Sequence, residues 1–154
     1  MFHIVLFEPE IPHNAGAAGR LALATDSTLH LIEPLGFSLD DKHVRRTGLD
    51  YWHRVRLQVW PSFEALRAQA PPSARFWLLS TRAKTSPWTA DFQPGDYLVF
   101  GRETTGLPAA MVEAAGERAL RIPMAPGGTR SLNLSTAIAI TLYEALRQQP
   151  PDWS

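Results

Sequence analysis

The residues best suited to chemistry lie in short segments that follow hydrophobic runs. The first is Asn14-Ala-Gly-Ala-Ala-Gly-Arg20, in which small residues accompany an amide and a guanidinium. Small residues at a helix start favour dinucleotide binding, and Glu33 is placed where an acid could bind a ribose. However, Asn14 replaces the first glycine of that fingerprint, and residues 9–13 are too long and proline-rich for the tight turn. Helix-to-sheet packing through Gly16 and Gly19 is the simpler interpretation, but it leaves Asn14 and Arg20 unexplained.

Two later segments have compositions that suit a ligand-binding loop. Gly101-Arg-Glu-Thr-Thr-Gly106 has the glycine spacing of a phosphate-binding loop, but Leu107-Pro108 replaces the Lys-Ser/Thr that a nucleoside-triphosphate site requires. An ordinary turn that carries one carboxylate, Glu103, is the other interpretation. Residues 122–135 are rich in Gly and Pro, and their free backbone N–H and C=O groups could hold a neutral ligand. Ser131 and Asn133 in this segment are equally suited to cap the helix that follows.

Charge is segregated at one place in a chain that is neutral as a whole, with Lys+Arg 15 against Asp+Glu 15. The interval 42–56 holds five cations and one acid, Asp50, with aromatic and histidine side chains among them. Such a run is usually a solvated helix face, but this mixture also suits a phosphate backbone with bases nearby. The residues that would bind RNA are Lys42, Arg45, Arg46, Arg54 and Arg56.

Several classes of function are excluded by composition. The chain has no cysteine, so disulfides, thiolate metal sites and cysteine nucleophiles are absent. Its histidines, at positions 3, 13, 30, 43 and 53, lack the spacing of metal ligands, and we expect no metal. The longest apolar runs are far shorter than the ~18 residues of a membrane span. We therefore expect a soluble, cytoplasmic protein that does not bind membranes.

The elements that must position these segments alternate between strands and helices. Hydrophobic runs predict strands over residues 3–8, 29–33, 55–60, 75–80, 97–101 and 120–124. Helices are predicted over 15–24, 40–46, 62–70 and 108–115, with Ser62 as an N-cap and Pro108 in a first turn. A final helix has an apolar stripe at Leu134, Ile138, Leu142, Ala145 and Leu146. This alternation predicts an α/β fold with a mostly parallel sheet, formed by one domain over 1–149 with a tail at 150–154.

Three segments, in this order, resemble the motifs of the SPOUT (α/β-knot) RNA 2′-O-methyltransferases. They are Asn14-x-Gly16-x-x-x-Arg20, Phe100-Gly101-x-Glu103-x-x-Gly106-Leu107, and Ile122-Pro123-Met124 with Ser131-Leu-Asn133-Leu-Ser135. The chain is also similar to the smallest members of that family, which act on the anticodon wobble nucleotide of tRNA, at Phe7-Glu-Pro-Glu-Ile-Pro12, Glu33-Pro-Leu-Gly-Phe37 and residues 40–51. The resemblance covers residues 2–149. Two departures concern substrate positioning: Ala17 stands where the family often has Asn, and the loop with Gly127-Gly128-Thr129 is one residue longer.

The resemblance implies flanking helices, a C-terminal deep trefoil knot, a homodimer, and the anticodon stem-loop of tRNA, leucine isoacceptors included, as substrate. It implies that S-adenosylmethionine is bound by Leu79, Ser80, Thr81, Gly101, Ile122, Met124, Ser131 and Leu132. The catalytic residues that it implies are Arg20, Asn14, Glu103, Ser131 and Asn133. A guanidinium with a pKa above ~12 is a poor base, so we expect Arg20 to hold phosphate and stabilise the developing alkoxide. A non-catalytic RNA- or protein-binding module on the same fold and a degenerate dinucleotide enzyme remain the alternatives.

Overall fold

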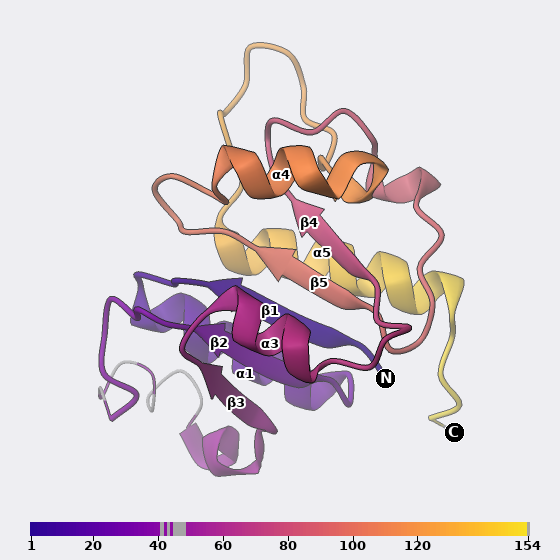
Figure 1. Ribbon diagram of the computed structural model, residues 1–154. Coiled ribbons are helices and arrows are strands. Elements are labelled where there is room, and N and C mark those ends of the chain that lie inside the picture. The colour runs from indigo at the N-terminus through magenta and orange to yellow at the C-terminus, as the bar shows by residue number, and fades with distance from the viewer. Residues whose placement is uncertain (41, 43, 45–48, 154) are drawn as a thin grey trace.

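A six-stranded parallel sheet forms the centre of the computed structural model, which describes residues 1–40, 42, 44 and 49–153 (Figure 1). The strands are β1 (His3–Phe7), β2 (Thr28–Ile32), β3 (Leu57–Trp60), β4 (Phe76–Leu79), β5 (Tyr97–Phe100) and β6 (Ala119–Leu120). Their order is β3-β2-β1-β5-β4-β6, and each pairing is parallel. The predicted α/β class with a parallel sheet is confirmed, while the trefoil knot stays an expectation from the resemblance.

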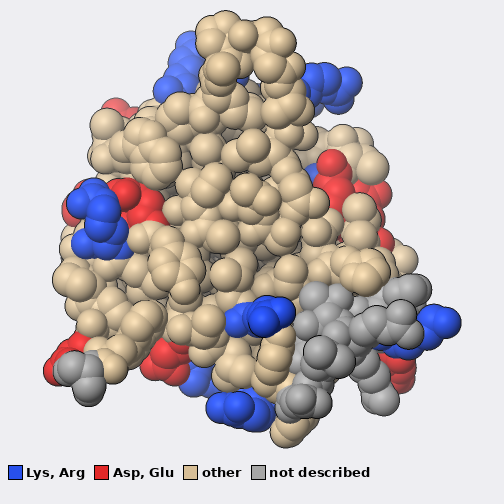
Figure 2. All heavy atoms as spheres, turned by 180° about the vertical axis from the view of Figure 1, so that it is seen from behind, with Lys and Arg blue, Asp and Glu red and all other residues tan. Residues whose placement is uncertain are grey.

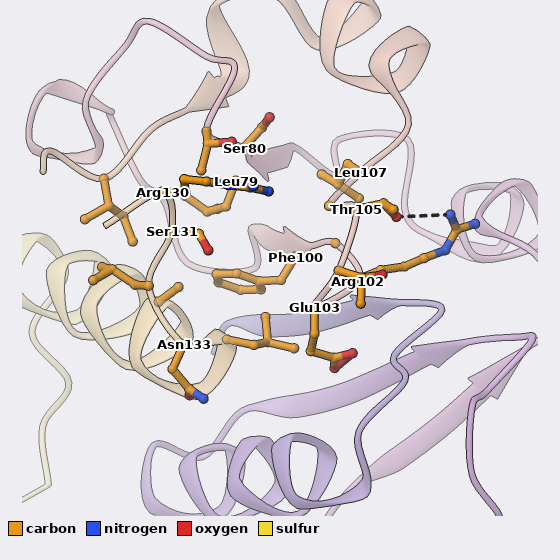
Figure 3. Close-up of a pocket in the computed structure, with 18 of the residues that line it drawn as sticks. Leu79, Ser80, Phe100, Arg102, Glu103, Thr105, Leu107, Arg130, Ser131 and Asn133 are labelled. Atoms are coloured by element: carbon orange, nitrogen blue, oxygen red, sulfur yellow. Dashed lines mark hydrogen bonds between the residues drawn. The ribbon is translucent and has the colours of Figure 1, made fainter. Parts of the chain in front are cut away.

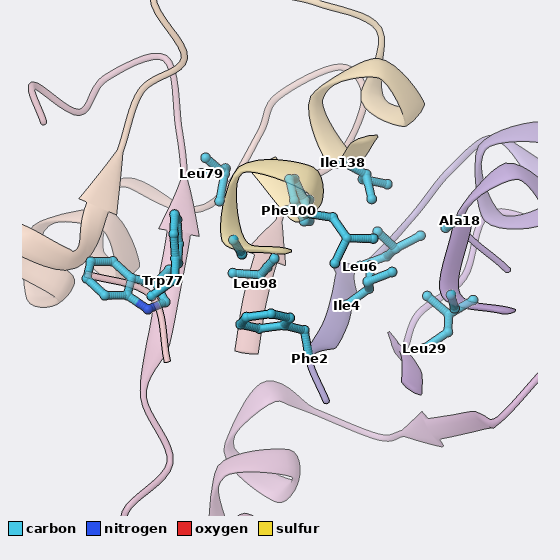
Figure 4. Packing of buried hydrophobic residues seen from close by; sticks show 14 of the residues in the cluster. Phe2, Ile4, Leu6, Ala18, Leu29, Trp77, Leu79, Leu98, Phe100 and Ile138 are labelled. Carbon is cyan, nitrogen blue, oxygen red and sulfur yellow. The ribbon is translucent and has the colours of Figure 1, made fainter. Parts of the chain in front are cut away.

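Helices cover both faces of this sheet. The α-helices are α1 (Pro12–Ala24), α3 (Phe63–Gln69), α4 (Ala109–Ala115) and α5 (Leu134–Gln148), and 3-10 helices are η1 (Leu49–Arg54), η2 (Pro87–Thr89) and η3 (Gly116–Arg118). Successive strand side chains point to opposite faces. Ile4 of β1 therefore packs in one cluster with Ala18 of α1 and Ile138 of α5 (Figure 4), whereas Val5 packs in a second cluster with residues of α3 and α4. The core is thus split into two layers by the sheet.

The helix ends agree with the sequence at some caps and differ at others. The Oγ atom of Ser62 accepts a hydrogen bond from the Ala65 N–H at 3.1 Å, and Asn133 caps α5 by accepting from the Ser135 N–H at 2.9 Å. Helix α1 begins at Pro12 rather than at residue 15, because a proline at the first helical position needs no N–H partner. Pro108 was predicted in the first turn of α4, and this is wrong: it is the extended N-cap residue, with φ −54° and ψ 138°.

The predicted strands also need correction near β3 and β6. Strand β3 begins at Leu57 rather than at residue 55, and β6 spans only Ala119–Leu120 instead of 120–124. The backbone leaves the ladder after Leu120 because the Arg121 N–H donates to the Thr85 carbonyl at 2.7 Å and Pro123 has no N–H to offer. The predicted helix 40–46 lies mostly outside the described residues, although Lys42 and Val44 are helical. Residues 150–153 have no regular secondary structure, and the division into domain and tail stays a prediction.

Two groups of buried or half-buried polar side chains lie on opposite faces of the sheet. His3, His30 and Trp60 form one group, and Arg75, Trp77 and Asp96 form the other, near the amino ends of β4 and β5. Nδ1 of His3 and Nε2 of His30 are 2.8 Å apart, and the Trp60 indole N–H donates to His30 Nδ1 at 3.0 Å. His30 must therefore carry its proton on Nε2. Burial lowers the pKa of His30 to about 3 and that of His3 to about 4, so both rings are neutral near neutral pH.

Asp96, directly before β5, is the acceptor in the second group. It is 3% exposed, and its carboxylate accepts from both Arg75 and the Trp77 indole, the latter at 2.7 Å. The Gln93 backbone N–H is a further donor, at 2.9 Å. A buried carboxylate requires hydrogen bonds that replace its lost hydration, and these donors supply them.

No helix among the described residues is long and apolar enough to cross a bilayer.

Candidate active site

A pocket of about 570 Å³ lies at the carboxyl ends of β4 and β5 (Figure 3). Its walls are the loops 79–82, 100–107 and 121–124, which follow β4, β5 and β6, and residues 130–134, which lead into α5. Ile11 and Asn14, at the start of α1, also line it. Ligands bind at the carboxyl ends of parallel strands in open α/β sheets, because the loops there can vary without disturbing the core. Parts of three segments singled out in the sequence, at Asn14, at 100–107 and at 122–134, therefore meet at one cavity.

All eight predicted cofactor contacts line this pocket: Leu79, Ser80, Thr81, Gly101, Ile122, Met124, Ser131 and Leu132. Four of the five predicted catalytic residues do so as well, namely Asn14, Glu103, Ser131 and Asn133. Glu33, the ribose-binding acid of the dinucleotide interpretation, is not part of the lining. The fold brings these residues together, and the role of each stays a prediction.

The loop after β5 is shaped by two glycines. A Cβ on Gly101 would lie 2.3 Å from the carbonyl carbon of Gly106, so no larger residue fits at this position. Gly106 has φ +70°, a left-handed conformation that favours glycine. Its N–H donates to the Arg102 carbonyl at 2.9 Å and closes the loop. Glu103 is therefore held at a tight turn that projects into the pocket.

Glu103 has one satisfied and one unsatisfied oxygen. Oε2 accepts from the backbone N–H of Glu10 at 2.8 Å, whereas Oε1 is buried without a hydrogen-bond partner. It is the only such side-chain atom in the part of the chain that the structure describes. An unpaired buried acceptor is costly unless a ligand supplies the donor. Glu103 is thus prepared to accept a hydrogen bond from a molecule in the pocket.

The connection between β1 and α1 is joined to the loop after β5 by hydrogen bonds and an ion pair. The Glu10 carboxylate accepts from the N–H and Oγ1 of Thr104 at 3.1 and 2.8 Å, and these hydrogen bonds lower the pKa of Glu10. Glu8 forms an ion pair with Arg102, and Arg102 also donates to the Thr105 hydroxyl (Figure 3). We call these contacts the Glu10–Thr104 clip. The clip couples the segment that leads to Asn14 to the loop that carries Glu103.

Helix α1 brings Asn14 to the pocket but not Arg20. Asn14 is 6% exposed, whereas Arg20 is exposed and its guanidinium lies 5.6 Å from the centre of the Tyr51 ring. Six residues along an α-helix turn by ~600°, so the two side chains leave on different faces. Gly19 faces η1 rather than the sheet, since a Cβ there would lie 2.4 Å from Trp52. Gly19 therefore permits close packing, as predicted, but against Trp52 of η1 and not against the sheet.

The two polar residues before α5, Ser131 and Asn133, form different hydrogen bonds. Asn133 uses its side-chain oxygen as the helix cap, which leaves its amide nitrogen as the group that can donate toward the pocket. Ser131 is exposed, and its backbone carbonyl accepts from the Thr129 hydroxyl at 3.1 Å. Figure 3 shows Ser131 and Asn133 on the opposite side of the pocket from Glu103. Donors and acceptors therefore surround the cavity.

Those predicted RNA-binding residues that the structure describes, Lys42, Arg54 and Arg56, do not line the pocket. Lys42 and Arg54 are exposed, and Arg45 and Arg46 lie outside the described residues. Arg56 precedes β3 at the amino end of the sheet, where it pairs with Asp26 at 2.8 Å. Its position is thus at the opposite end of the strands from the cavity.

Sequence reasoning missed several residues of the pocket wall. Arg82, Arg121 and Arg130 line the cavity, as do Phe100 and Thr104. Each arginine is the immediate neighbour of a residue predicted to contact cofactor, so the signal was proximity to the motifs. The sequence analysis predicts a neutral ligand in these loops, and such a ligand gives no reason to expect arginines in the pocket wall.

The pocket residues fit S-adenosylmethionine better than a metal. The loops 79–81 and 122–124 offer backbone groups and aliphatic side chains, which suit an adenosine, and Glu103 Oε1 is an orphaned acceptor beside them. No group of three or more His, Cys, Asp or Glu side chains among the described residues could hold a metal ion.

Comparison with known proteins places this geometry in a family. The model of the SpoU rRNA methylase family matches residues 1–143. The chain belongs to that family. A tRNA (cytidine(34)-2′-O)-methyltransferase of Polaromonas sp. is 50% identical over 150 residues, which are 96% of this chain and 91% of the relative.

Solved structures of SpoU-type enzymes superpose closely. One that concerns the 2-OH methylation of C/U34 on tRNA has a TM-score of 0.90 at 47% identity and covers 97% of this chain and 96% of its own. The SpoU methyltransferase AviRb of Streptomyces viridochromogenes, in complex with the cofactor AdoMet, has a TM-score of 0.78 at 28% identity. That match covers 96% of this chain and 57% of AviRb.

Proposed function

We propose that this SpoU-family chain transfers a methyl group from S-adenosylmethionine to the ribose 2′-hydroxyl of nucleotide 34, the wobble cytidine or uridine, in tRNA. The observation that carries the proposal is the convergence of the three motif segments on one pocket at the carboxyl ends of the strands. The 50% identity to a tRNA (cytidine(34)-2′-O)-methyltransferase over nearly the whole chain supports the choice of substrate.

The chemistry requires orientation more than acid or base strength. When bound, S-adenosylmethionine would supply an activated methyl group. The 2′-oxygen would bond to that methyl as the sulfur–methyl bond breaks, with S-adenosylhomocysteine as the leaving group and the hydroxyl proton passing to water. The residues that would hold the cofactor are those of loops 79–81 and 122–124, with Gly101, Ser131 and Leu132. Glu103 Oε1 and the Asn133 amide would orient the ribose and its neighbours, because both residues line the cavity and Oε1 has no partner within the described chain. Correct placement of this kind can supply much of a rate enhancement.

Arg20 is proposed as the cation that stabilises the growing charge on the 2′-oxygen and binds the adjoining phosphate. Because Arg20 is exposed and outside the pocket of its own chain, we propose a homodimer in which it reaches the pocket of the partner subunit. The exposure of Ile11 (42%) at the pocket edge and of Tyr143 (48%) on α5 supports an apolar contact between subunits. Lys42 and Arg54, which are exposed, would then bind RNA as well, and Arg45 and Arg46 stay predicted RNA-binding residues from the sequence. We place the reaction in the cytoplasm, where tRNA is modified.

The function is tested by incubating the protein with S-adenosylmethionine and leucine tRNA transcripts and mapping the 2′-O-methylated nucleotides. Methylation at nucleotide 34 alone is expected. A transcript with a 2′-deoxy residue at position 34 is the control and should not be modified. Modification at another position, or cofactor binding without methyl transfer, would contradict the proposal, and the latter would favour the non-catalytic module.

The shared site is tested by mixing two inactive variants. Arg20→Ala and Glu103→Gln chains, unfolded together and refolded, should recover activity, since each mixed dimer contains one site with neither substitution. Mass spectrometry of the mixture measures how much mixed dimer has formed. Mixed dimers without activity, or a stable and active monomer in sedimentation, would refute the arrangement.

A further inference from the structure

Three arginines of the pocket wall have no assigned role. Arg82 follows β4, Arg121 follows β6, and Arg130 lies at the end of the glycine-rich loop before α5, yet all three line one cavity. All are exposed, and no ion pair involves any of them within the described part of the chain. The Arg121 N–H also joins two of these segments by its hydrogen bond to Thr85. Figure 2 shows basic side chains on both sides of the loop that projects at this end of the molecule.

The pocket wall is consequently basic. Among the described residues, Glu103 is its only acidic member, and the fourth arginine, Arg102, is already neutralised by Glu8. Unpaired cations at the mouth of a cavity create a positive potential there, which attracts anions and repels cations. The charge must therefore suit a molecule that is strongly negative.

The cofactor is not that molecule. S-adenosylmethionine carries a sulfonium and an ammonium against a single carboxylate and is itself net positive. Three unpaired arginines exceed what one carboxylate can use, and they oppose the overall charge of the cofactor. An RNA backbone has one phosphate for each nucleotide, and basic side chains that neutralise it gain affinity by releasing counterions.

We propose that Arg82, Arg121 and Arg130 form an arginine rim that binds phosphates of the RNA beside the target nucleotide. The inference rests on the proposed function and adds a second phosphate-binding surface to it. The rim lies on the loops after β4 and β6 and on the loop before α5, whereas Arg20 lies on α1, against which η1 packs. Phosphates held at the rim would fix the RNA from the cofactor side and place the ribose against Glu103. The carboxylate of the cofactor is the other anion that the rim could bind. RNA phosphates and the cofactor carboxylate are distinguished by their binding affinities in the arginine variants.

The test uses single Arg82→Gln, Arg121→Gln and Arg130→Gln variants and the triple variant, with Arg67→Gln as the matched control. Arg67 is an exposed arginine on α3 that packs over Phe63 and does not line the pocket. The probe is a tRNA anticodon stem-loop, and its affinity is measured against salt concentration. The triple variant should bind at least about tenfold more weakly at ~0.1 M salt, and each single variant should reduce the salt slope by up to ~1. Arg67→Gln should change neither.

Cofactor titrations distinguish the two anions. Both S-adenosylmethionine and its demethylated product, S-adenosylhomocysteine, have the carboxylate, but only the former has the sulfonium charge. If the rim serves RNA, the triple variant should bind S-adenosylmethionine somewhat better relative to S-adenosylhomocysteine than the wild type does, because a repulsion has been removed. Equal losses for both cofactors with unchanged RNA affinity would assign the rim to the carboxylate and overturn the proposal.

The failure of this inference differs from the failure of the proposed function. Wild-type methylation of nucleotide 34 with full RNA affinity in the triple variant would remove the rim and keep the function. Salt-dependent RNA binding through the rim without any methyl transfer would keep the rim and refute the proposed function. Unfolding temperatures confirm that the exposed substitutions leave the fold intact, and the three single variants supply the same comparison if the triple variant does not fold.

Discussion

At the amino ends of the strands Asp96 accepts four hydrogen bonds, whereas at the carboxyl ends Glu103 has one oxygen buried with no partner. His30 is likewise engaged on both ring nitrogens, while three arginines of the pocket wall have no ion-pair partner among the described residues. Satisfied polar groups stabilise a fold, and unsatisfied ones wait for a ligand. The difference indicates that one end of the sheet serves stability and the other serves recognition.

The strongest test of this division is loss of the catalytic cation. Arg20→Ala should lower turnover by about 10²–10³-fold, by analogy with the ~3–4 kcal/mol lost when an oxyanion donor is removed. Cofactor affinity and unfolding temperature should stay near wild type, because Arg20 is exposed and outside its own pocket. Arg20→Lys should rescue poorly, since an ammonium lacks the planar fork of donors. Single-turnover kinetics and calorimetric cofactor titrations measure both quantities, and near-normal turnover would remove Arg20 from the mechanism.

The converse test disturbs the amino end. Asp96→Asn should reduce the free energy of unfolding by about 2–3 kcal/mol, because Arg75 donates to both carboxylate oxygens and the amide nitrogen must then face one of these donors. Activity of the remaining folded protein should be unchanged. Asp26→Asn, at an exposed ion pair with Arg56, is the matched control and should cost less than about 1 kcal/mol. Chemical denaturation of both variants checks the difference, and equal losses would contradict it.

Acid should weaken the same end of the molecule in a defined pH range. Burial lowers the pKa of His3 to about 4 and of His30 to about 3, from 6.5 in the unfolded chain. As the pH falls, the histidines of the unfolded chain therefore bind protons before those of the folded chain. The contribution of the two neutral histidines to the free energy of unfolding is complete above pH 6.5 and is lost as the pH falls toward 4. Linkage predicts a slope of about 1.4 kcal/mol per pH unit for each histidine that only the unfolded chain protonates.

The measurement is the free energy of unfolding between pH 5 and 7. His30→Gln should reduce the slope, because one of the two titrating rings is gone. A slope that is unchanged in His30→Gln would show that other groups control the acid response.

The smallest effect is expected at the Glu10–Thr104 clip, where polar groups at the carboxyl end are satisfied. Thr104→Val removes the hydroxyl that donates to Glu10 and keeps the shape of the side chain. We expect the KM for tRNA to rise about two- to threefold with kcat nearly constant, because exposed hydrogen bonds are individually weak. Thr105→Val, which removes only a 3.4 Å contact with Arg102, is the control and should have a smaller effect. A large fall in kcat for Thr104→Val would instead place the clip in the catalytic step.

Local patterns in the sequence were sufficient for most of the strands, for the caps at Ser62 and Asn133 and for the α/β class. Alternation in Ile4-Val5-Leu6-Phe7 reports burial on two faces, and Ser62 and Asn133 are recognisable caps because their partners are two or three residues away. They failed where the decisive contact was distant, as for β6, whose continuation is lost to a hydrogen bond between Arg121 and Thr85. Chain periodicity contains no information about such pairs.

The residue types of the candidate site were likewise present in the sequence, and resemblance to a family connected the three segments that carry them. Only the tertiary structure decided that Arg20 leaves the helix away from the pocket, and that Arg82, Arg121 and Arg130 line it. It also decided that Glu103 keeps one oxygen free, because its other oxygen bonds to the Glu10 N–H, 93 residues away along the chain. The physical reason is that local sequence determines the conformation of each segment, whereas hydrogen bonding and charge balance depend on which segments the sheet order brings together.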